Sequence, residues 1–318
     1  MDKNIKILII GFGSIGRRHY QNLLKLGFKN IYVYDIDKNK LAGEKLKTTE
    51  KINAGTLKQF RAVLICNPND AHVQTAIKCA QAGCHIFIEK PLAPSLKNIK
   101  ALVKICHSKK LTNMVACNLR FHPCLKFIKN YLDKNSLGKI YSIRHDFGYF
   151  LPYWRPEQDY RKNYAAKKAS GGGIILDDIH EFDLLFWFNG FSPVVETKFI
   201  FDKTSALAIE TEDNCVAAFK FVNKTLGSVS CDYLQQAYSR NCKIVGAKGN
   251  LTWDFNENIV WLHAKKRKNN LFQIKNYQAN QMYLDELSYF FWCVFKRQPA
   301  ANDIKTAALV LKYCINKI

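Results

Sequence analysis

The strongest constraint on the fold is an apolar run that ends in closely spaced glycines. Residues 6–10 predict a buried first strand, and Gly11, Gly13 and Gly16 follow it directly. A strand, a G-x-G-x-x-G turn and a helix form the dinucleotide-binding unit of a doubly wound sheet. There the first glycine permits the tight turn, the second lets the backbone approach a pyrophosphate, and the third lets helix pack on strand. The alternative is a bare strand-to-helix turn that binds nothing.

Short apolar runs alternate with helix-like stretches as far as residue 120, which is the pattern of βαβ units. Helices are expected to begin near Ile15, Asp70 and Ser95. The five predicted strands are residues 6–10, 31–34, 62–66, 85–88 and 113–116. The pattern predicts an NAD-binding Rossmann domain, residues 1–120, with a doubly wound parallel sheet.

Beyond residue 120 the pattern changes to alternating strands joined by short turns, and it ends in two helical patterns. The strands are expected at residues 206–212, 215–222, 227–233 and 241–245, and the helices at 283–295 and 304–317. This predicts a C-terminal α+β domain, residues 121–318, with an open, mostly antiparallel sheet. Because the apolar side of an open sheet needs cover, the domain is expected to bind substrate and to form a homodimer or homotetramer.

Charge and cysteine usage limit the class of protein. The formal net charge is +22, but no basic helix or RNA-binding signature accompanies it, so we expect no nucleic-acid partner and attribute the charge to steering of anionic small molecules or to a lysine-rich proteome. No apolar run reaches the roughly 18 residues of a membrane span. The eleven cysteines form no CxxC pair and no zinc-type cluster, so no metal is expected. With no export signal, they predict a cytoplasmic protein.

The residue that ends the second predicted strand indicates which cofactor binds. Asp35 lies about twenty residues beyond the glycines, where a carboxylate accepts hydrogen bonds from the adenosine-ribose hydroxyls and repels a 2′-phosphate. NAD is therefore favoured. Lys38 and Lys40 leave NADP as the alternative, since cations near the ribose accommodate a phosphate.

A lysine follows the fourth predicted strand, in the sequence Glu89-Lys90-Pro91. The carboxyl ends of parallel strands are where such folds bind their ligands. An ammonium there is placed to hydrogen-bond a reacting hydroxyl or carbonyl and to lower the pKa of the alcohol as hydride leaves. The alternative is a surface lysine paired with Glu89.

Several motifs occur in an order and context that resemble one known family. They are Gly11 to Gly16, Asn67-Pro68 with His72, Glu89-Lys90-Pro91, Asn118-Leu119-Arg120-Phe121, Gly171-Gly172-Gly173 followed by Asp177, His180 and Asp183, and the stretch 244–249. The chain is similar over nearly its whole length to the glucose-fructose oxidoreductase, inositol dehydrogenase and MocA-like oxidoreductase family. The resemblance implies cofactor-binding roles for Gly11, Phe12, Gly13, Ser14, Ile15, Gly16, Asp35, Asn67, Pro68, His72, Glu89 and Lys90.

The resemblance also implies a catalytic group of Lys90, Asp177 and His180. A histidine is a general base near neutral pH, and residues three apart on a helix share one face, so Asp177, His180 and Asp183 are expected to face one cleft. Family members commonly place the aspartate four positions before the histidine. This chain is one residue tighter, which leaves open whether Asp177 or Asp178 takes that role. The alternative for His180 is a packed core residue.

A long aromatic loop, residues 149–156, offers a stacking face for a sugar ring, with nearby arginines to hold a phosphate or carboxylate. The alternatives are a loop held down by its own aromatics and, for Arg120, interdomain polar packing. The predicted substrate-binding residues are Lys90, Arg120, Trp154, Arg155, Tyr160, Arg161, Asp177 and His180.

Together these features predict an NAD-dependent oxidoreductase that moves a hydride between nicotinamide and a hydroxyl-bearing carbon of a sugar or nucleotide-sugar. The tight Asp-Asp-Ile-His spacing, with Trp154-Arg155-Pro156 and Asp159-Tyr160-Arg161, resembles a subgroup of bacterial surface-polysaccharide and sialic-acid-like sugar pathways. The alternatives are a glycosidase or epimerase that oxidises its sugar transiently, and a non-catalytic NAD-binding regulator.

Overall fold

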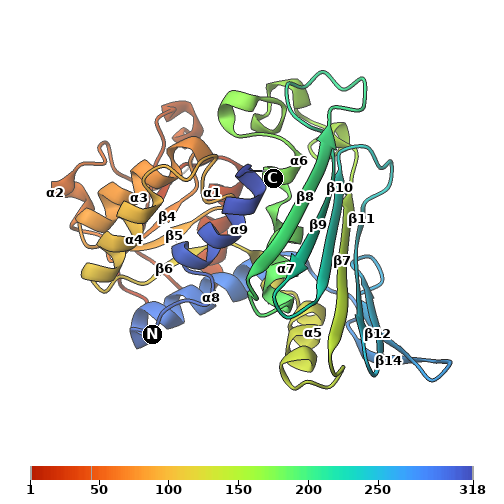
Figure 1. Ribbon diagram of the computed structural model, residues 1–318. Coiled ribbons are helices and arrows are strands. Elements are labelled where there is room, and N and C mark those ends of the chain that lie inside the picture. The colour runs from red at the N-terminus through yellow and green to blue at the C-terminus, as the bar shows by residue number, and fades with distance from the viewer. Residues whose placement is uncertain (1, 44, 317–318) are drawn as a thin grey trace. The chain divides into compact units, whose positions relative to one another are not determined.

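The computed structural model describes residues 2–43 and 45–316, which form two compact units (Figure 1). The first unit contains the chain up to Asn118 together with Asn280–Lys312. The second contains Leu119–Ala279 and the residues that follow Lys312. Each unit has its own sheet.

The first unit is built on six parallel strands, which confirms the predicted doubly wound sheet. Their order is β3-β2-β1-β4-β5-β6, with the reversal between β1 and β4 that creates a ligand-binding crevice in such sheets. The two-residue strand β3 was not predicted, because its side chains are exposed and carry no apolar run. The strands are β1 (Ile7–Ile10), β2 (Ile31–Tyr34), β3 (Lys47–Thr48), β4 (Ala62–Ile65), β5 (His85–Ile88) and β6 (Asn113–Val115).

Helices connect these strands, and a later segment of the chain adds two more. The helix expected near Ser95 begins at Ile99, after Asn98 adopts a left-handed conformation with φ 63°. The predicted helix end at Lys317 lies outside the described residues. The helices are α1 (Ser14–Lys25), α2 (Ala54–Leu57), α3 (His72–Gln81), α4 (Ile99–Ser108), α8 (Asn280–Lys296) and α9 (Ile304–Asn316), with 3₁₀ turns η1 (Lys38–Leu41) and η2 (Asn69–Ala71).

The return of the chain to the first unit differs from the predicted division into 1–120 and 121–318, because residues 280–312 group with the first unit. Asn302 exchanges hydrogen bonds with Val115 of the edge strand β6, at 2.9 Å through the backbone and 2.8 Å through the Asn302 amide. The backbone N–H of Cys117 donates to Glu286 of α8 at 2.6 Å. An edge strand exposes unpaired backbone groups, and this segment satisfies them, which a local pattern does not reveal.

The second unit holds an eight-stranded sheet of order β14-β13-β12-β11-β7-β10-β9-β8. Only β7 and β10 are parallel, so the predicted open, mostly antiparallel sheet is confirmed. The strands are β7 (Ile140–Gly148), β8 (Val194–Asp202), β9 (Asn214–Phe221), β10 (Leu226–Asp232), β11 (Ser239–Gly246), β12 (Gly249–Asp254), β13 (Ile259–Ala264) and β14 (Arg267–Gln273).

The predicted strand at residues 206–212 is wrong, since this stretch is a loop between β8 and β9. Asp213 is fully buried, and its carboxylate accepts four hydrogen bonds from the backbone and hydroxyl groups of Thr204 and Ser205. These bonds hold the start of the loop close to its end, so the chain cannot run on as a strand.

Three α-helices lie on one face of this sheet (Figure 1). They are α5 (Pro123–Asp133), α6 (Ile174–Asp177) and α7 (Ile179–Phe188), with 3₁₀ turns η3 (Asn118–Phe121), η4 (Leu151–Tyr153), η5 (Tyr160–Lys162), η6 (Tyr164–Ala166) and η7 (Lys168–Ser170). Fully buried side chains such as Ile143, Leu185 and Ile244 fill the space between helices and sheet. On the other face, Ile200 of β8 and Val216 of β9 are direct neighbours and remain 69% and 49% exposed.

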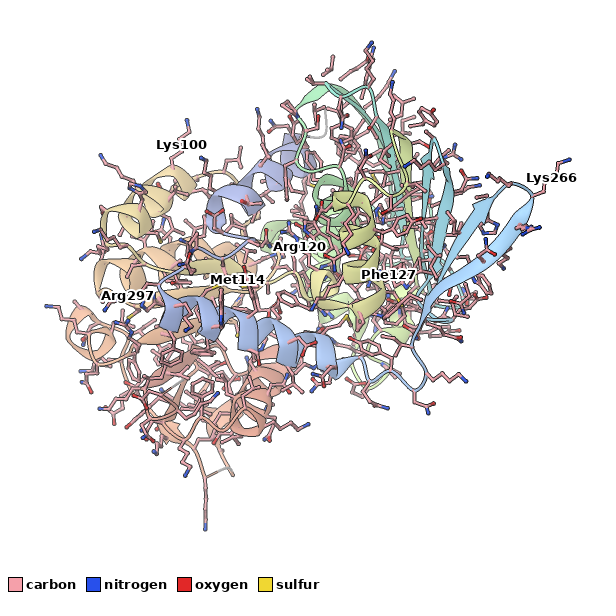
Figure 2. All side chains as sticks on the ribbon, turned by 90° about the horizontal axis from the view of Figure 1, so that it is seen from below. Lys100, Met114, Arg120, Phe127, Lys266 and Arg297 are labelled. Carbon is pink, nitrogen blue, oxygen red and sulfur yellow. The ribbon has the colours of Figure 1, made fainter. Side chains whose placement is uncertain are left out.

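Basic side chains extend from separate elements of the surface. Figure 2 shows Lys100 extending from α4 and Lys266 from the tip of the hairpin between β13 and β14. Within the described part of the chain, no helix combines the length and apolar character needed to cross a bilayer.

Candidate active site

The three glycines of the glycine-rich turn have different roles: the fold needs Gly11 and Gly16, whereas Gly13 leaves room for a ligand. A Cβ on Gly11, which has φ 97°, would lie 2.5 Å from the backbone of Cys66 and Asn67, and one on Gly16 would lie 2.0 Å from the Gly11 carbonyl oxygen. A Cβ on Gly13 would meet no heavy atom within 4 Å. Gly13 is the N-cap of α1, so open space lies where helix N–H groups point outward. This cradle fits the pyrophosphate of a dinucleotide.

Asp35 ties the end of β2 to this turn. Its Oδ2 accepts a hydrogen bond of 2.7 Å from the backbone N–H of Phe12, and its Oδ1 accepts one of 2.9 Å from Asp37. The Lys40 ammonium lies 3.8 Å from Oδ1. Phe12 itself is buried, whereas Ser14 is exposed and Ile15 half-buried at the start of α1. The carboxylate predicted to meet the ribose is therefore at the rim of the cradle.

Glu89, next to Lys90, is held inside the first unit by a residue that was not predicted. His19 Nε2, from α1, lies 2.5 Å from Glu89 Oε1, and the Lys90 backbone N–H donates to Glu89 Oε2 at 3.3 Å. Burial opposes ionisation of Glu89, but the hydrogen bond with His19 and the charges nearby lower its pKa. Glu89 therefore links the helix of the glycine turn to the backbone of Lys90.

His72 holds the other side of the same segment. Its Nδ1 lies 2.9 Å from the Pro91 carbonyl oxygen, and its Nε2 lies 2.8 Å from that of Asn67. Burial lowers the pKa of the His72 imidazole. Pro68 precedes the 3₁₀ turn η2 that leads into α3. The structure thus brings together Asn67, Pro68, His72, Glu89 and Lys90 at the ends of β4 and β5.

In the second unit, the expected single helical face is interrupted. Asp177 ends α6 and His180 lies in the first turn of α7, with Asp178 between the helices at φ −104° and ψ 40°. The expectation that Asp177, His180 and Asp183 follow one helix is therefore corrected, since the backbone breaks between the first two. Asp177 is buried and His180 is half-buried.

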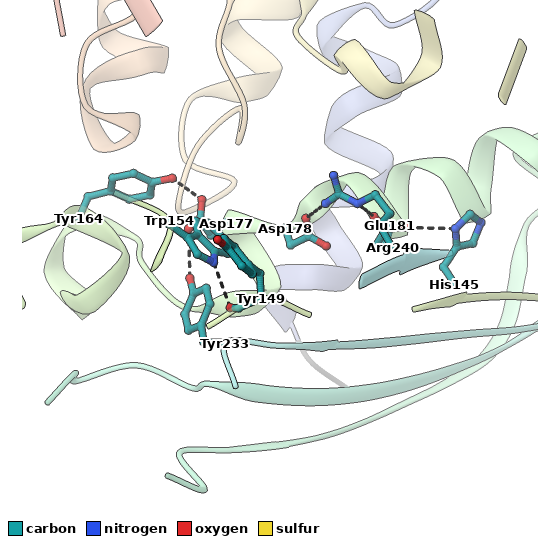
Figure 3. A network of polar contacts seen from close by, with 9 residues as sticks. All are labelled: His145, Tyr149, Trp154, Tyr164, Asp177, Asp178, Glu181, Tyr233 and Arg240. Carbon is teal, nitrogen blue, oxygen red and sulfur yellow. Dashed lines mark hydrogen bonds and ion pairs between the residues drawn. The ribbon is translucent and has the colours of Figure 1, made fainter. Parts of the chain in front are cut away.

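Asp177 and Asp178 have different partners (Figure 3). The hydroxyls of Tyr164 and Tyr233 both donate to the Asp177 carboxylate, the second at 3.2 Å. Burial, with Asp177 and Tyr164 nearby, raises the pKa of the Tyr233 phenol, so it stays a donor. Asp178 instead accepts a hydrogen bond from the buried guanidinium of Arg240. The adjacent carboxylates thus belong to different networks.

Arg120 makes a bidentate ion pair inside the second unit. Its Nε lies 2.7 Å from Asp183 Oδ2 and its Nη2 lies 2.6 Å from Asp183 Oδ1, with both side chains buried. The guanidinium also lies over the rings of Trp187 and Phe191, at 5.6 and 5.3 Å. These contacts are polar packing within the second unit, so they do not test the expected packing between domains, and a substrate contact of Arg120 remains a prediction.

The loop that follows β7 is held largely by its own residues. The Trp154 indole N–H donates to the Tyr149 carbonyl at 3.0 Å, and the Tyr160 hydroxyl accepts from the Ala208 backbone N–H at 3.2 Å. Arg161 pairs with Asp159 at 2.8 Å on the surface, and Arg155 is half-buried. Within the described residues these contacts hold the loop, and they leave Arg161 exposed at its surface.

The sequence patterns missed His19, Tyr164, Tyr233 and Arg240. Arg240 lies two residues before buried Cys242 on β11, so the period of two marked it as inward-facing. His19 lies one helical turn after Gly16, on the face that packs on the sheet. Tyr164 carries no such signal, because it begins η6, a three-residue 3₁₀ turn too short to show a period.

Comparisons with known proteins identify a family. A model described as an oxidoreductase family with an NAD-binding Rossmann fold, GFO/IDH/MocA, matches residues 5–117. A model of the C-terminal domain of the same family matches residues 125–252. The two matches together span most of the chain.

The sequences of individual relatives differ from this chain at most positions. Myo-inositol 2-dehydrogenase of Thermotoga maritima is 26% identical, over 98% of this chain and 96% of that protein. Levoglucosan dehydrogenase of Pseudarthrobacter phenanthrenivorans is 28% identical, over 62% of this chain but only 56% of the relative. A solved levoglucosan dehydrogenase with NADH and L-sorbose has the same fold, with a TM-score of 0.83, 18% identity and coverage of 99% of this chain and 96% of that one.

Proposed function

The chain belongs to the GFO/IDH/MocA oxidoreductase family, and from this premise we propose that it is an NAD-dependent dehydrogenase acting on a hydroxyl-bearing carbon of a sugar or nucleotide-sugar. The observation that carries the proposal is the open backbone at Gly13 beside α1, in the same unit as Lys90 at the end of β5. Relatives named for dehydrogenation of myo-inositol and levoglucosan support a polyhydroxylated substrate.

Gly11, Gly13 and Gly16 with the start of α1 would hold the pyrophosphate of NAD, and Asp35 the adenosine ribose. When bound, NAD supplies the hydride acceptor for alcohol oxidation. The cofactor-binding roles of Phe12, Ser14, Ile15, Asn67, Pro68, His72 and Glu89 belong to the same proposal. Within it, Glu89 and His72 act by holding the segment that carries Lys90.

We assign proton handling to Lys90 and His180. The Lys90 ammonium would hydrogen-bond the reacting oxygen and stabilise its developing negative charge, and the His180 imidazole would take the hydroxyl proton in oxidation and return it in reduction. Of the two candidate carboxylates, we assign the site role to Asp177. Asp178 accepts a hydrogen bond from Arg240, whereas Asp177 accepts hydrogen bonds from two tyrosine hydroxyls, and this difference supports Asp177 for the role.

We further propose that the second unit binds the sugar, with the exposed Arg161 and the half-buried Arg155 of this loop as candidates to bind an anionic group. Trp154 would shape that loop through its hydrogen bond to Tyr149, and Tyr160 through its hydrogen bond to Ala208 of the loop between β8 and β9. Arg120 would act through Asp183. In this proposal the second unit takes the role of the substrate domain that was expected at residues 121–318.

We also propose that the protein forms a homodimer or homotetramer through the uncovered face of the second sheet. Ile200 and Val216 lie together there and are exposed. An Ile200→Asp variant should then have a lower mass by light scattering after size exclusion, and an unchanged mass would argue against this interface. A cytoplasmic location is proposed from the eleven cysteines, which all lie in the described chain, are buried and form no disulfide there.

The test is to mix the protein with NAD and a panel of nucleotide-sugars, amino sugars and sugar acids, and to record NADH absorbance together with product mass. Lys90→Ala should abolish turnover, whereas Lys100→Ala removes an exposed lysine from α4 of the same unit and should not. Stoichiometric NADH supports a net dehydrogenase. Product without NADH would favour transient oxidation, and NAD binding without turnover on any sugar would favour a regulator.

A further inference from the structure

Four titratable side chains form a buried group beneath the start of α7, which we call the Arg240 cluster: His145, Asp178, Glu181 and Arg240 (Figure 3). His145 comes from β7 and Arg240 from β11, which are neighbours in the sheet. The exposed fractions are 2% for His145, 2% for Asp178, 0% for Glu181 and 7% for Arg240. Burying an ionisable group costs free energy unless the group is paired, so the partners of each of these side chains matter.

Arg240 is the centre of this cluster. Its Nη2 donates to Asp178 Oδ1, and its Nε lies 2.7 Å from Glu181 Oε1. The other oxygen of Glu181, Oε2, lies 3.1 Å from His145 Nδ1. The guanidinium lies over the ring of Phe147, with its central carbon 4.3 Å from the ring centroid. Although burial opposes the charge, the carboxylates of Asp178 and Glu181 raise the pKa of Arg240, so it stays a cation.

The two carboxylates that Arg240 holds lie on either side of His180 in the chain. Asp178 is the residue at which the backbone breaks between α6 and α7, and Glu181 follows His180 directly. One guanidinium therefore fixes both ends of the four-residue stretch 178–181. A rigid fork that binds both ends of a stretch limits how the backbone between them can turn.

We infer that Arg240 is a positioning residue for His180 and Asp177, acting through Asp178 and Glu181. The inference rests on the proposed function, because it assigns Arg240 to the site proposed there. Asp177 precedes the held stretch directly, so the same pairing also sets the backbone from which it meets Tyr164 and Tyr233. Arg240 does not touch substrate in this account. It fixes the break that turns Asp177 and His180 away from a shared helical face.

The fork geometry makes Arg240→Lys the informative change. Lysine keeps the positive charge between the two acids but presents a single ammonium, which cannot reproduce the planar arrangement of Nε and Nη2. Arg144→Lys is a matched control, since Arg144 lies on β7 of the same sheet with its side chain exposed. Asp178→Asn is a second variant that releases one end of the stretch and leaves Arg240 paired with Glu181, for use if Arg240→Lys does not fold.

The experiment measures kcat and the KM for NAD on the sugar that the panel identifies. Arg240→Lys should lower kcat by about 10- to 100-fold, because small misplacements of a catalytic group cost that much, and should leave the KM for NAD unchanged, because the cradle lies in the other unit. Asp178→Asn should lower kcat in the same direction by a smaller factor. Arg144→Lys should match the parent protein.

A second readout does not depend on activity. In protein labelled with ¹³C-histidine, the imidazole resonance of His180, assigned with His180→Asn, should shift in Arg240→Lys and stay in place in Arg144→Lys. An unmoved His180 resonance, or a folded Arg240→Lys protein with parental kcat, would overturn the inference. If His180→Asn itself keeps full activity, the proposed function fails instead, and the resonance still decides whether Arg240 positions His180.

Discussion

Two glycines of the same turn should respond in opposite ways to the same added methyl group. In Gly16→Ala the new Cβ lies 2.0 Å from the carbonyl oxygen of Gly11, and backbone on both sides of that contact cannot rotate away as a flexible side chain would. Overpacking costs about 1–3 kcal/mol, and a clash with backbone belongs at or above the upper end of that range. Gly16→Ala should therefore lower the Tm by several degrees.

In Gly13→Ala the added Cβ meets nothing within 4 Å, and the residue has an ordinary φ of −75°. The fold should lose at most about 1 kcal/mol, from replacing a glycine at an N-cap. The methyl group instead fills the space proposed for the pyrophosphate, so we expect NAD affinity to fall by about 10- to 100-fold, which is roughly 1.4–2.7 kcal/mol.

Thermal unfolding without ligand and calorimetric titration with NAD separate the two effects. Gly16→Ala should show the lower Tm of the pair, and Gly13→Ala should lose NAD affinity with a Tm near that of the parent. A Gly13→Ala protein that binds NAD like the parent would refute the placement of the pyrophosphate. A fully stable Gly16→Ala protein would refute the packing argument.

Three further results are expected. Glu89→Gln weakens the charge-assisted hydrogen bond with His19 and should cost about 1.5–3 kcal/mol in urea unfolding, together with activity; a variant of parental stability would contradict this. Asp35→Ala should reduce NAD binding and raise the preference for NADP in kcat/KM, and an unchanged ratio would remove Asp35 from cofactor selection. Burial lowers the pKa of His85 and of His122 to about 4, so below pH 6.5 the unfolded chain takes up protons before the folded protein does. Each of these histidines should therefore lower the free energy of unfolding by about 1.4 kcal/mol per pH unit between pH 6.5 and 4, as urea titrations would show. If this free energy falls no less steeply with pH in His122→Gln than in the parent, the prediction is contradicted.

Local patterns were sufficient for five of the six strands of the first sheet and for the motifs at its edge. The glycine turn and the Glu89-Lys90-Pro91 motif lie where the strand and helix periodicity placed them. The predictions for strand β3 and for residues 206–212 failed for opposite reasons. Strand β3 was missed because it has no apolar run to detect. Residues 206–212 were predicted as a strand because they are strand-like, but buried Asp213 holds them in a loop.

The sequence alone determined the fold class, the family and the order of its motifs, because each depends on residues close together in the chain. Only the tertiary structure decided which polar side chains are already engaged. His19 pairs with Glu89 across 70 residues, Arg120 with Asp183 across 63, and Arg240 with Asp178 across 62. Such pairing follows from the packing of sheet and helix, which brings distant charges together where water cannot solvate them, and no local period encodes it.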